Sequence, residues 1–226
     1  MALHFVRHAS SLYNIASAEW NPAEPKTIMW EERFIDTLLA PVGVEQATLA
    51  KERVAALAVD LVVVSPLRRA LETCQILFGD RGVPIRVCPL FTEQLCNAPD
   101  MSAFLGQPFE EYSHFDWSEL LGKDVCLAVK NDITARIQSE SQSKSHAQTL
   151  MLATMRSMNP AYVESSEELT ARVWAARAYL KKELDTGKRI AVVTHSYLIR
   201  ELMKQLQGVG RVIDNCEVFT VDPSEI

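Results

Sequence analysis

Three short apolar runs, at residues 3–6, 61–64 and 190–193, limit the folds that this chain can adopt. Each run is rich in β-branched residues and does not alternate with polar residues, which is typical of parallel strands buried on both faces. Weaker strands are predicted at residues 84–87 and 218–221. The runs indicate a mostly parallel sheet that is covered by helices on both sides.

Helical patterns fill the segments between these runs. A helix over residues 41–57 begins with a proline, and Ser65-Pro66 has the form of a cap followed by a first-turn proline. The segment 165–184 begins with Ser165 and Glu168 at capping-box spacing, repeats apolar residues at helical intervals and ends before Gly187. Because strands alternate with helices, we predict a three-layer α/β/α fold around a mostly parallel central sheet.

Residues 94–163 differ from the rest of the chain. Their hydrophobic periodicity is poor, and they include the polar run 139–145. We interpret residues 1–226 as a single domain in which 94–163 is an inserted helical segment, a cap over the edge of the sheet where a ligand would bind. The alternative is a structural elaboration that does not contact a ligand.

Charge and cysteine content exclude some classes of partner. The formal net charge is −6 and the pI is about 5.4, whereas nucleic acids and anionic membranes bind net basic faces. No apolar run reaches the length of a membrane span, and Arg7-His8 stand where a signal peptide would still be hydrophobic. The five cysteines are scattered and odd in number, which is typical of reduced thiols. We expect a cytoplasmic protein without nucleic-acid or membrane partners.

Polar side chains with phosphate chemistry follow the predicted strands. Ligands of open parallel sheets bind beyond the carboxyl ends of the strands. The residues found there, in chain order, are Arg7-His8, Ser65 to Arg69, Glu93 and Thr194-His195. Two histidines, at least two arginines and one carboxylate are therefore expected at the same edge, where they predict an anion site.

These residue types suit a phosphomonoester. Arginine keeps its charge and offers a planar fork of donors to two phosphate oxygens. A neutral imidazole is a competent nucleophile near pH 7, and a carboxylic acid with a raised pKa can protonate the leaving alkoxide. The helix that we expect to begin at Ser65-Pro66 would direct its positive end to the same place.

Five motifs resemble those of the histidine phosphatase superfamily, in order along nearly the whole chain. Arg7-His8-Ala9, followed by Asn14, resembles the family's Arg-His-Gly signature and later asparagine. Residues 65–73 are similar to Ser-Pro-Leu-x-Arg-Ala-x-x-Thr, which assigns the family's second phosphate arginine to Arg69. Residues 39–47 resemble Leu-Thr-Pro-x-Gly-x-x-Gln-Ala, and the C-terminal half is matched by Glu164-Ser165 and by residues 192–195. The resemblance implies a phosphoglycerate mutase-like fold.

The resemblance also implies a role for each matching residue. His8 would accept the phosphoryl group and Glu93 would donate the proton. Because Glu93 lacks the Gly-rich continuation seen in many mutases, Asp100 or Asp116 in the insert is an alternative donor. The phosphoryl oxygens would be held by Arg7, Asn14, Arg69, His195 and the backbone N–H of Ser196. Ala9 and Ser196 replace the glycines that usually follow the two catalytic histidines.

We therefore predict a metal-independent phosphatase, without a cofactor, that acts through a phosphohistidine on His8. The expected substrate is a small phosphorylated metabolite, with a phosphoprotein as the less favoured choice, and a homodimer is compatible with the sequence. A phosphoglycerate mutase is the second enzymatic reading. Few cations lie within 94–163 to bind a second anionic group, so hydrolysis is favoured. A third reading is a catalytically weak family member that serves as a binding or scaffold protein. A metal hydrolase is disfavoured, because the remaining histidines do not form a cluster with ligand spacing.

Overall fold

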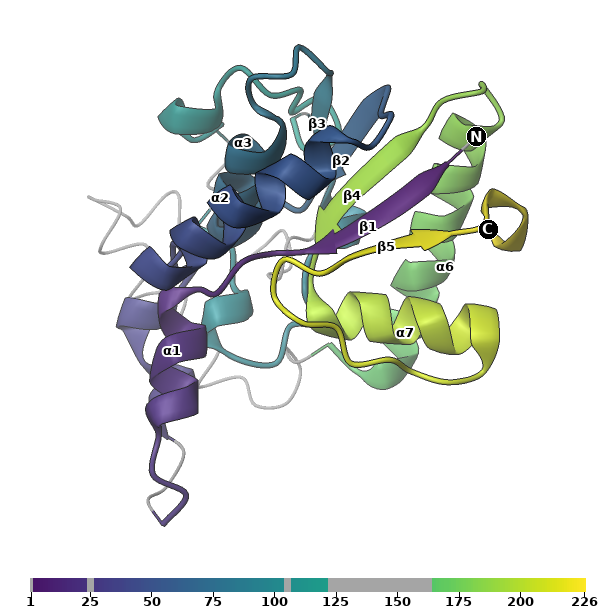
Figure 1. Cartoon of the computed structure of the whole chain (residues 1–226). Coiled ribbons are helices and arrows are strands. Elements are labelled where there is room, and N and C mark those ends of the chain that lie inside the picture. The colour runs from purple at the N-terminus through teal and green to yellow at the C-terminus, as the bar shows by residue number, and fades with distance from the viewer. Residues whose placement is uncertain (1, 24–26, 104–106, 122–163) are drawn as a thin grey trace.

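The computed structural model describes residues 2–23, 27–103, 107–121 and 164–226. Within them, one sheet contains β1 (Leu3–Arg7), β2 (Leu61–Val64), β3 (Ile85–Val87), β4 (Ile190–Thr194) and β5 (Val218–Val221). The α-helices are α1 (Leu12–Glu19), α2 (Pro41–Ala55), α3 (Arg68–Phe78), α6 (Ser166–Leu184) and α7 (Ser196–Gln207). The strand order is β3-β2-β4-β1-β5, with every neighbouring pair parallel except β1 and β5 (Figure 1). The predicted α/β fold is confirmed.

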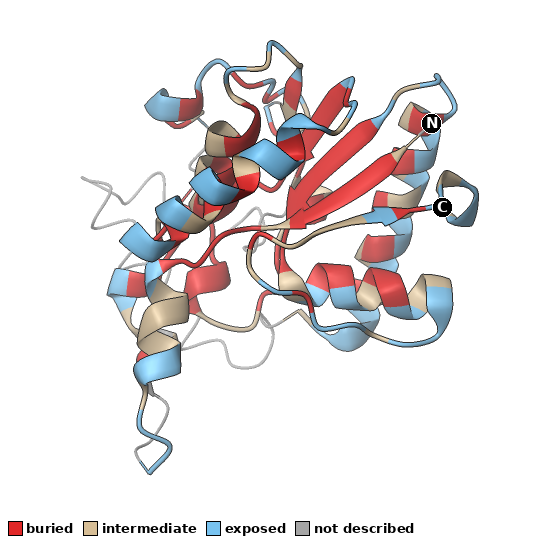
Figure 2. Ribbon diagram, in the orientation of Figure 1, coloured by how far each residue is buried: buried red, intermediate tan, exposed pale blue. Residues whose placement is uncertain are grey.

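Burial on both faces explains why the strands are continuously apolar. Val62 and Val64 belong to the core cluster that includes α2 and α3, whereas Leu61 and Val63 belong to the cluster that includes α6 and α7. Successive side chains of a strand point to opposite faces, so each face of β2 needs its own apolar residues. Figure 2 shows the central strands buried between the two helical layers.

The register of the central strands fixes the position of the functional edge. Arg7 of β1 pairs with Thr194 of β4, and Val64 of β2 pairs with Val193. Beyond these pairs, the His8 N–H donates to Thr194 O (2.9 Å) and the Ser65 N–H donates to Val193 O (3.1 Å). The residues that follow β1, β2 and β4 therefore emerge side by side.

The predicted cap of α6 is confirmed. The Ser165 hydroxyl accepts from the Glu168 N–H, and the Glu168 carboxylate accepts from the Ser165 N–H. After α6 the chain turns at Gly187, whose φ of 88° lies in the left-handed region that favours glycine. None of the described helices has the length and apolar composition needed to cross a membrane.

The expected start of α3 at Ser65-Pro66 is wrong. The helix begins at Arg68, whose N–H donates to the Asp36 carboxylate (2.8 Å). The other oxygen of Asp36 accepts from the Ala103 N–H (2.7 Å). A buried carboxylate from a distant segment therefore caps this helix, which leaves Ser65 available for a different contact.

The described part of segment 94–163 divides into two pieces. Residues 94–103 reach the functional edge, as detailed below. Residues 107–121 pack into the core beside α3, and the Asp116 backbone pairs with β3 through Asp116 N to Ile85 O and Val87 N to Asp116 O, both 2.8 Å. The remainder of the predicted cap, 122–163 with its polar run 139–145, lies outside the described residues.

Candidate active site

His8 is buried immediately beyond β1, at 3% exposure. Its Nδ1 lies 2.7 Å from the Ala9 carbonyl oxygen, which can only accept, so Nδ1 carries the hydrogen. The lone pair is then on Nε2, which accepts from Arg69 Nε at 3.3 Å. Burial, together with the charges of Arg69 and Arg7, lowers the pKa of His8 well below its ordinary value. His8 is therefore a neutral imidazole, and its Nε2 can act as a nucleophile once it leaves the hydrogen bond from Arg69.

Backbone contacts fix the loop that carries His8. The Ala9 N–H donates to the Thr73 hydroxyl (3.0 Å), one turn beyond Arg69 on α3, and Asn215 Nδ2 donates to His8 O (2.8 Å). Gly43 of α2 lies so close to Ser10 that a Cβ at position 43 would overlap the Ser10 carbonyl oxygen. The motifs at 39–47 and 65–73 thus both support the His8 loop.

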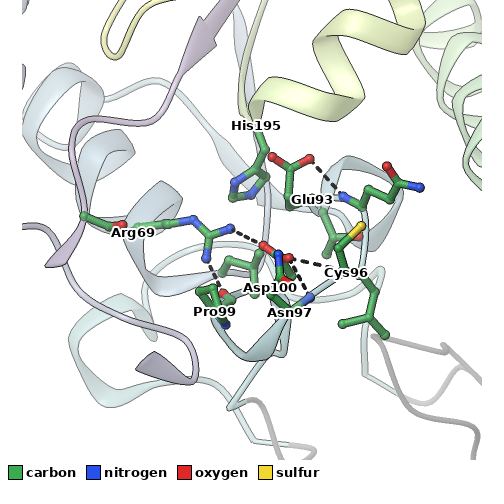
Figure 3. A network of polar contacts seen from close by, with 12 residues as sticks. Arg69, Glu93, Cys96, Asn97, Pro99, Asp100 and His195 are labelled. Carbon is green, nitrogen blue, oxygen red and sulfur yellow. Dashed lines mark hydrogen bonds and ion pairs between the residues drawn. The ribbon is translucent and has the colours of Figure 1, made fainter. Parts of the chain in front are cut away.

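Arg69, at 4% exposure, stands between His8 and a carboxylate. Its Nη1 donates to Pro99 O, and its Nη2 forms an ion pair with Asp100 Oδ1 at 3.3 Å (Figure 3). Asp100 is oriented in turn by the N–H groups of Cys96 (3.3 Å) and Asn97 (3.1 Å). A phosphoryl group that binds Arg69 must therefore compete with Asp100 for the guanidinium.

His195 follows β4 and is fully buried, with its ring centroid 4.9 Å from that of His8. Its Nε2 lies 2.7 Å from the Ser65 hydroxyl, which also accepts from the Leu67 N–H (3.2 Å). The Leu67 amide occupies one lone pair of this hydroxyl, which can use either its hydrogen or its second lone pair toward Nε2, and we predict that it donates its hydrogen. Nδ1 of His195 then carries a hydrogen, and it has no hydrogen-bond partner in the described part of the chain. That Nδ1 donates to a phosphoryl oxygen stays a prediction.

Glu93 is buried beneath the first turn of α7. Its carboxylate accepts from the Tyr197 N–H (3.1 and 3.3 Å to the two oxygens) and from the Gln94 N–H (2.9 Å). Burial raises the pKa of Glu93, although these hydrogen bonds and the charge of Arg69 oppose the shift. The positive end of α7 is therefore directed at Glu93, and one N–H at the start of α3, that of Arg68, is used by Asp36; the expected use of the α3 terminus for phosphate stays a prediction.

The remaining predicted phosphate ligands are less directly placed. Arg7 is half-buried and donates from Nη1 to Ile213 O, while its charge acts on His8 and Glu93. The Asn14 side-chain oxygen accepts from the Ser11 N–H and hydroxyl, both at 3.0 Å, in the capping box of α1. Ser196 is the first residue of α7. Phosphate contacts by these three residues stay predictions.

The two substitute proton donors have different surroundings. Burial and the charge of Glu93 raise the pKa of Asp100, while the charge of Arg69 opposes the shift. Asp116 pairs with Arg86 of β3 at 3.2 Å, and although burial opposes it, hydrogen bonds from Ser118 and Arg86 lower the pKa of this carboxyl. Asp100 belongs to the site, whereas Asp116 does not.

Sequence reasoning missed the contact between Ser65 and His195, which could have been found from the strand ends. Both residues follow strands that are paired in register, and Ser65 lies one position beyond the Val64–Val193 pair, so the two residues emerge close together. The Arg69–Asp100 pair and Arg172, described below, had no comparable signal. Among the described residues, no group of three or more His, Cys, Asp or Glu side chains is arranged to bind a metal ion.

The family model of the histidine phosphatase superfamily (branch 1) matches residues 3–112 and 133–224. Three solved structures are similar to this chain. A putative alpha-ribazole-5'-P phosphatase from Escherichia coli is 21% identical, with 98% of this chain and 90% of that chain covered and a TM-score of 0.57. A phosphoglycerate mutase from Bacillus anthracis is 18% identical, with 97% of this chain and 86% of that chain covered and a TM-score of 0.57. A mycobacterial glucosyl-3-phosphoglycerate phosphatase is 20% identical, with 97% of this chain and 88% of that chain covered and a TM-score of 0.53. The search of curated proteins gave no match. At these identities the structures share the fold.

Removing the Ser65 hydroxyl should remove the preference of His195 for the tautomer with hydrogen on Nδ1. In Ser65→Ala, Nε2 loses its partner, so the hydrogen is no longer held on Nδ1 and phosphate loses a donor. We expect inorganic phosphate to bind about 10-fold more weakly, equivalent to about 1.4 kcal/mol. Isothermal titration measures the affinity, and ¹⁵N chemical shifts report the tautomer. Ser118→Ala, at an exposed serine, is the control. Unchanged ¹⁵N shifts in Ser65→Ala would contradict this assignment.

Proposed function

We propose that this chain, which belongs to the histidine phosphatase superfamily (branch 1), hydrolyses phosphomonoesters through a phosphohistidine on His8. The observation that carries the proposal is the state of His8, a buried neutral imidazole whose Nε2 faces the guanidinium of Arg69. A nucleophile needs this lone pair, and a transferring phosphoryl group needs the adjacent positive charge. Arg7, Arg69 and His195 supply that charge and hydrogen bonding, so we propose that no metal ion is required.

The first step transfers the phosphoryl group to the enzyme. His8 Nε2 attacks phosphorus and forms a P–N bond, while the P–O bond to the alcohol breaks. The leaving oxygen takes the proton of the Glu93 carboxyl, so the products are the free alcohol, phosphohistidine and the Glu93 carboxylate. As the phosphoryl oxygens bind Arg69, they displace the carboxylate of Asp100.

The second step restores the enzyme. A water molecule attacks phosphorus and the Glu93 carboxylate removes its proton. The P–N bond then breaks, which yields inorganic phosphate, neutral His8 and a protonated Glu93. The same carboxyl thus serves as acid and then as base.

The carboxyls of the pocket favour hydrolysis over mutase chemistry. A mutase must hold a second anionic group while the bisphosphate reorients, which calls for further cations. Here Arg69 is flanked by Asp100 and Glu93, and acidic residues outnumber basic ones in 94–163. The likeness to the Bacillus anthracis mutase makes isomerisation the second candidate. A scaffold role is disfavoured, because such a protein would not need His8, Arg69 and His195 together.

We propose a small phosphorylated metabolite as the substrate class, ahead of a phosphoprotein. Similar structures are named for phosphatases of alpha-ribazole-5'-P and glucosyl-3-phosphoglycerate, which are small phosphorylated compounds.

We also propose a cytoplasmic location. The described cysteines Cys74, Cys88, Cys96 and Cys216 are free, as is typical of proteins in a reducing compartment.

A covalent intermediate on His8 is the first expectation from this mechanism. Brief reaction with a ³²P-labelled phosphodonor in buffer containing EDTA should leave an acid-labile, base-stable label on the protein. His8→Ala should lose the label and at least about 10³-fold in kcat, because no other group replaces the nucleophile. His114→Ala, at an exposed histidine, is the matched control. Labelling of His8→Ala, or a requirement for added divalent cations, would contradict the mechanism.

Opposite pKa shifts of His8 and Glu93 set the expected pH dependence. The lowered pKa of His8 keeps the nucleophile neutral into the acid range, and the raised pKa of Glu93 keeps the donor protonated above the usual range of a carboxyl. We expect kcat for an alkyl phosphate to be highest on the acid side of neutrality and to fall as pH rises through the pKa of Glu93. Glu93→Gln should abolish this fall and lower kcat for alkyl phosphates by about 10²-fold or more.

With p-nitrophenyl phosphate, whose leaving group needs little protonation, the kcat of Glu93→Gln should fall far less than it does with an alkyl phosphate. Asp100→Asn is the matched variant, since Asp100 is the other buried carboxyl beside Arg69. If Asp100→Asn shows the dependence on leaving group and Glu93→Gln does not, the proton donor is Asp100.

Net hydrolysis can be separated from isomerisation directly. We expect 3-phosphoglycerate, offered with catalytic 2,3-bisphosphoglycerate, to give no 2-phosphoglycerate ahead of free phosphate, because the pocket has few cations for a second anionic group. Enzymatic detection of both products over time makes the measurement. Isomer formation well ahead of phosphate release would make the chain a mutase.

A further inference from the structure

Arg172 of α6 joins several parts of the chain through one guanidinium. Nη1 donates to the carbonyl oxygens of Leu90 (3.0 Å) and Thr92 (2.8 Å), and Nη2 donates to that of Glu93 (3.3 Å). Nε and Nη2 also donate to the two carboxylate oxygens of Glu164, each at 2.6 Å. A guanidinium has five N–H donors, so every donor of Arg172 has an acceptor. Both side chains are largely buried, with exposed fractions of 17% for Arg172 and 16% for Glu164.

Glu164 stands where the chain returns from segment 94–163. Its N–H donates to Leu95 O (2.9 Å), and its carbonyl accepts from Gln94 Nε2 (3.0 Å). Its carboxylate also accepts from the Leu95 N–H at 3.4 Å. The Arg172–Glu164 pair therefore links the two ends of the segment to each other and to the backbone of Glu93.

Glu93 is consequently held from two helices. Arg172 of α6 binds its carbonyl oxygen and those of two preceding residues, while the Tyr197 N–H of α7 binds its carboxylate. A short loop with no regular pairing of its own would otherwise have several orientations available. Proton transfer requires the donor within hydrogen-bonding distance of the leaving oxygen.

We infer that Arg172, anchored by Glu164, is a positioning residue that directs the Glu93 carboxyl at the leaving group. The inference rests on the proposed role of Glu93 as proton donor. It predicts that the loss of Arg172 acts on the rate through Glu93, and so depends on how much protonation the leaving group needs. A merely structural role would slow all substrates alike.

Arg172→Met removes the donors and keeps an unbranched apolar chain of similar length. We expect kcat to fall by about 10- to 100-fold with an alkyl phosphate, and by no more than about 3-fold with p-nitrophenyl phosphate, because displacing a catalytic group by about 1 Å can cost about 10² in rate. Arg172→Lys should recover part of the loss. Arg177→Met, one and a half turns along the same helix and outside the pocket, should leave both rates unchanged.

A double-mutant cycle separates this inference from the proposed function. In a Glu93→Gln background, Arg172→Met should change the alkyl phosphate rate by less than about 3-fold, since the group on which Arg172 acts is already lost. Equal losses on both substrates, or full additivity in the cycle, would overturn the inference. If Glu93→Gln alone shows no dependence on leaving group, the failure lies with Glu93 as donor.

Urea unfolding of each variant provides the fold control. Should Arg172→Met fail to fold, Glu164→Gln tests the same point, because it removes the charge that anchors Arg172 and retains the guanidinium. The same preference for loss on alkyl phosphates is expected, at smaller magnitude. Its absence in a folded Glu164→Gln protein would overturn the inference.

Discussion

A permanently charged group in the interior, the guanidinium of Arg69, determines the state of everything around it. Burying a charge is costly unless it is paired, and arginine cannot lose its proton to avoid that cost. Asp100 supplies the pairing on one side, and the neutral Nε2 of His8 accepts a hydrogen bond on the other. Burial and, after it, the charge of Arg69 lower the pKa of both His8 and His195. Burial beside this cation thus keeps both histidines neutral.

The pKa values of the two buried carboxyls, Glu93 and Asp100, shift in the opposite direction. Burial raises the pKa of Glu93 and Asp100, which also repel each other when both are ionised. A phosphoryl group that arrives at Arg69 adds negative charge beside both. One of the two carboxyls can then take up a proton, and a protonated Glu93 is the form that can act as an acid.

Most of the fold could be predicted because its signals are local. Continuous apolar runs identify strands buried on two faces, and each observed strand lies within one residue of its predicted bounds. The Ser165 cap of α6 depends only on residues three apart. The strand ends also indicated which of the histidines and arginines would meet.

The errors concern contacts between residues far apart in the sequence. Ser65 was expected to cap α3, but its hydroxyl contacts His195 and the Leu67 N–H that precedes the helix, and Asp36 accepts from the first helical N–H. The Asn14 side-chain oxygen closes the α1 capping box, whereas a phosphate oxygen would accept from its Nδ2, so the predicted phosphate contact is compatible with the cap. Arg172 lies within a regular helix, where no local pattern distinguishes it from a solvent-exposed arginine. Its importance depends on three carbonyl groups some eighty residues earlier.

The position of β1 in the sheet has a consequence for how the molecule forms during synthesis. Its two neighbours are β4 and β5, both in the last part of the chain. During synthesis β1 therefore has no partner strand until residues 190–194 have left the ribosome. Long-range pairing of this kind slows folding and leaves apolar surface exposed in the nascent chain. His8 therefore reaches its position beside Arg69 only after β1 has paired with β4, so the site is completed late in folding.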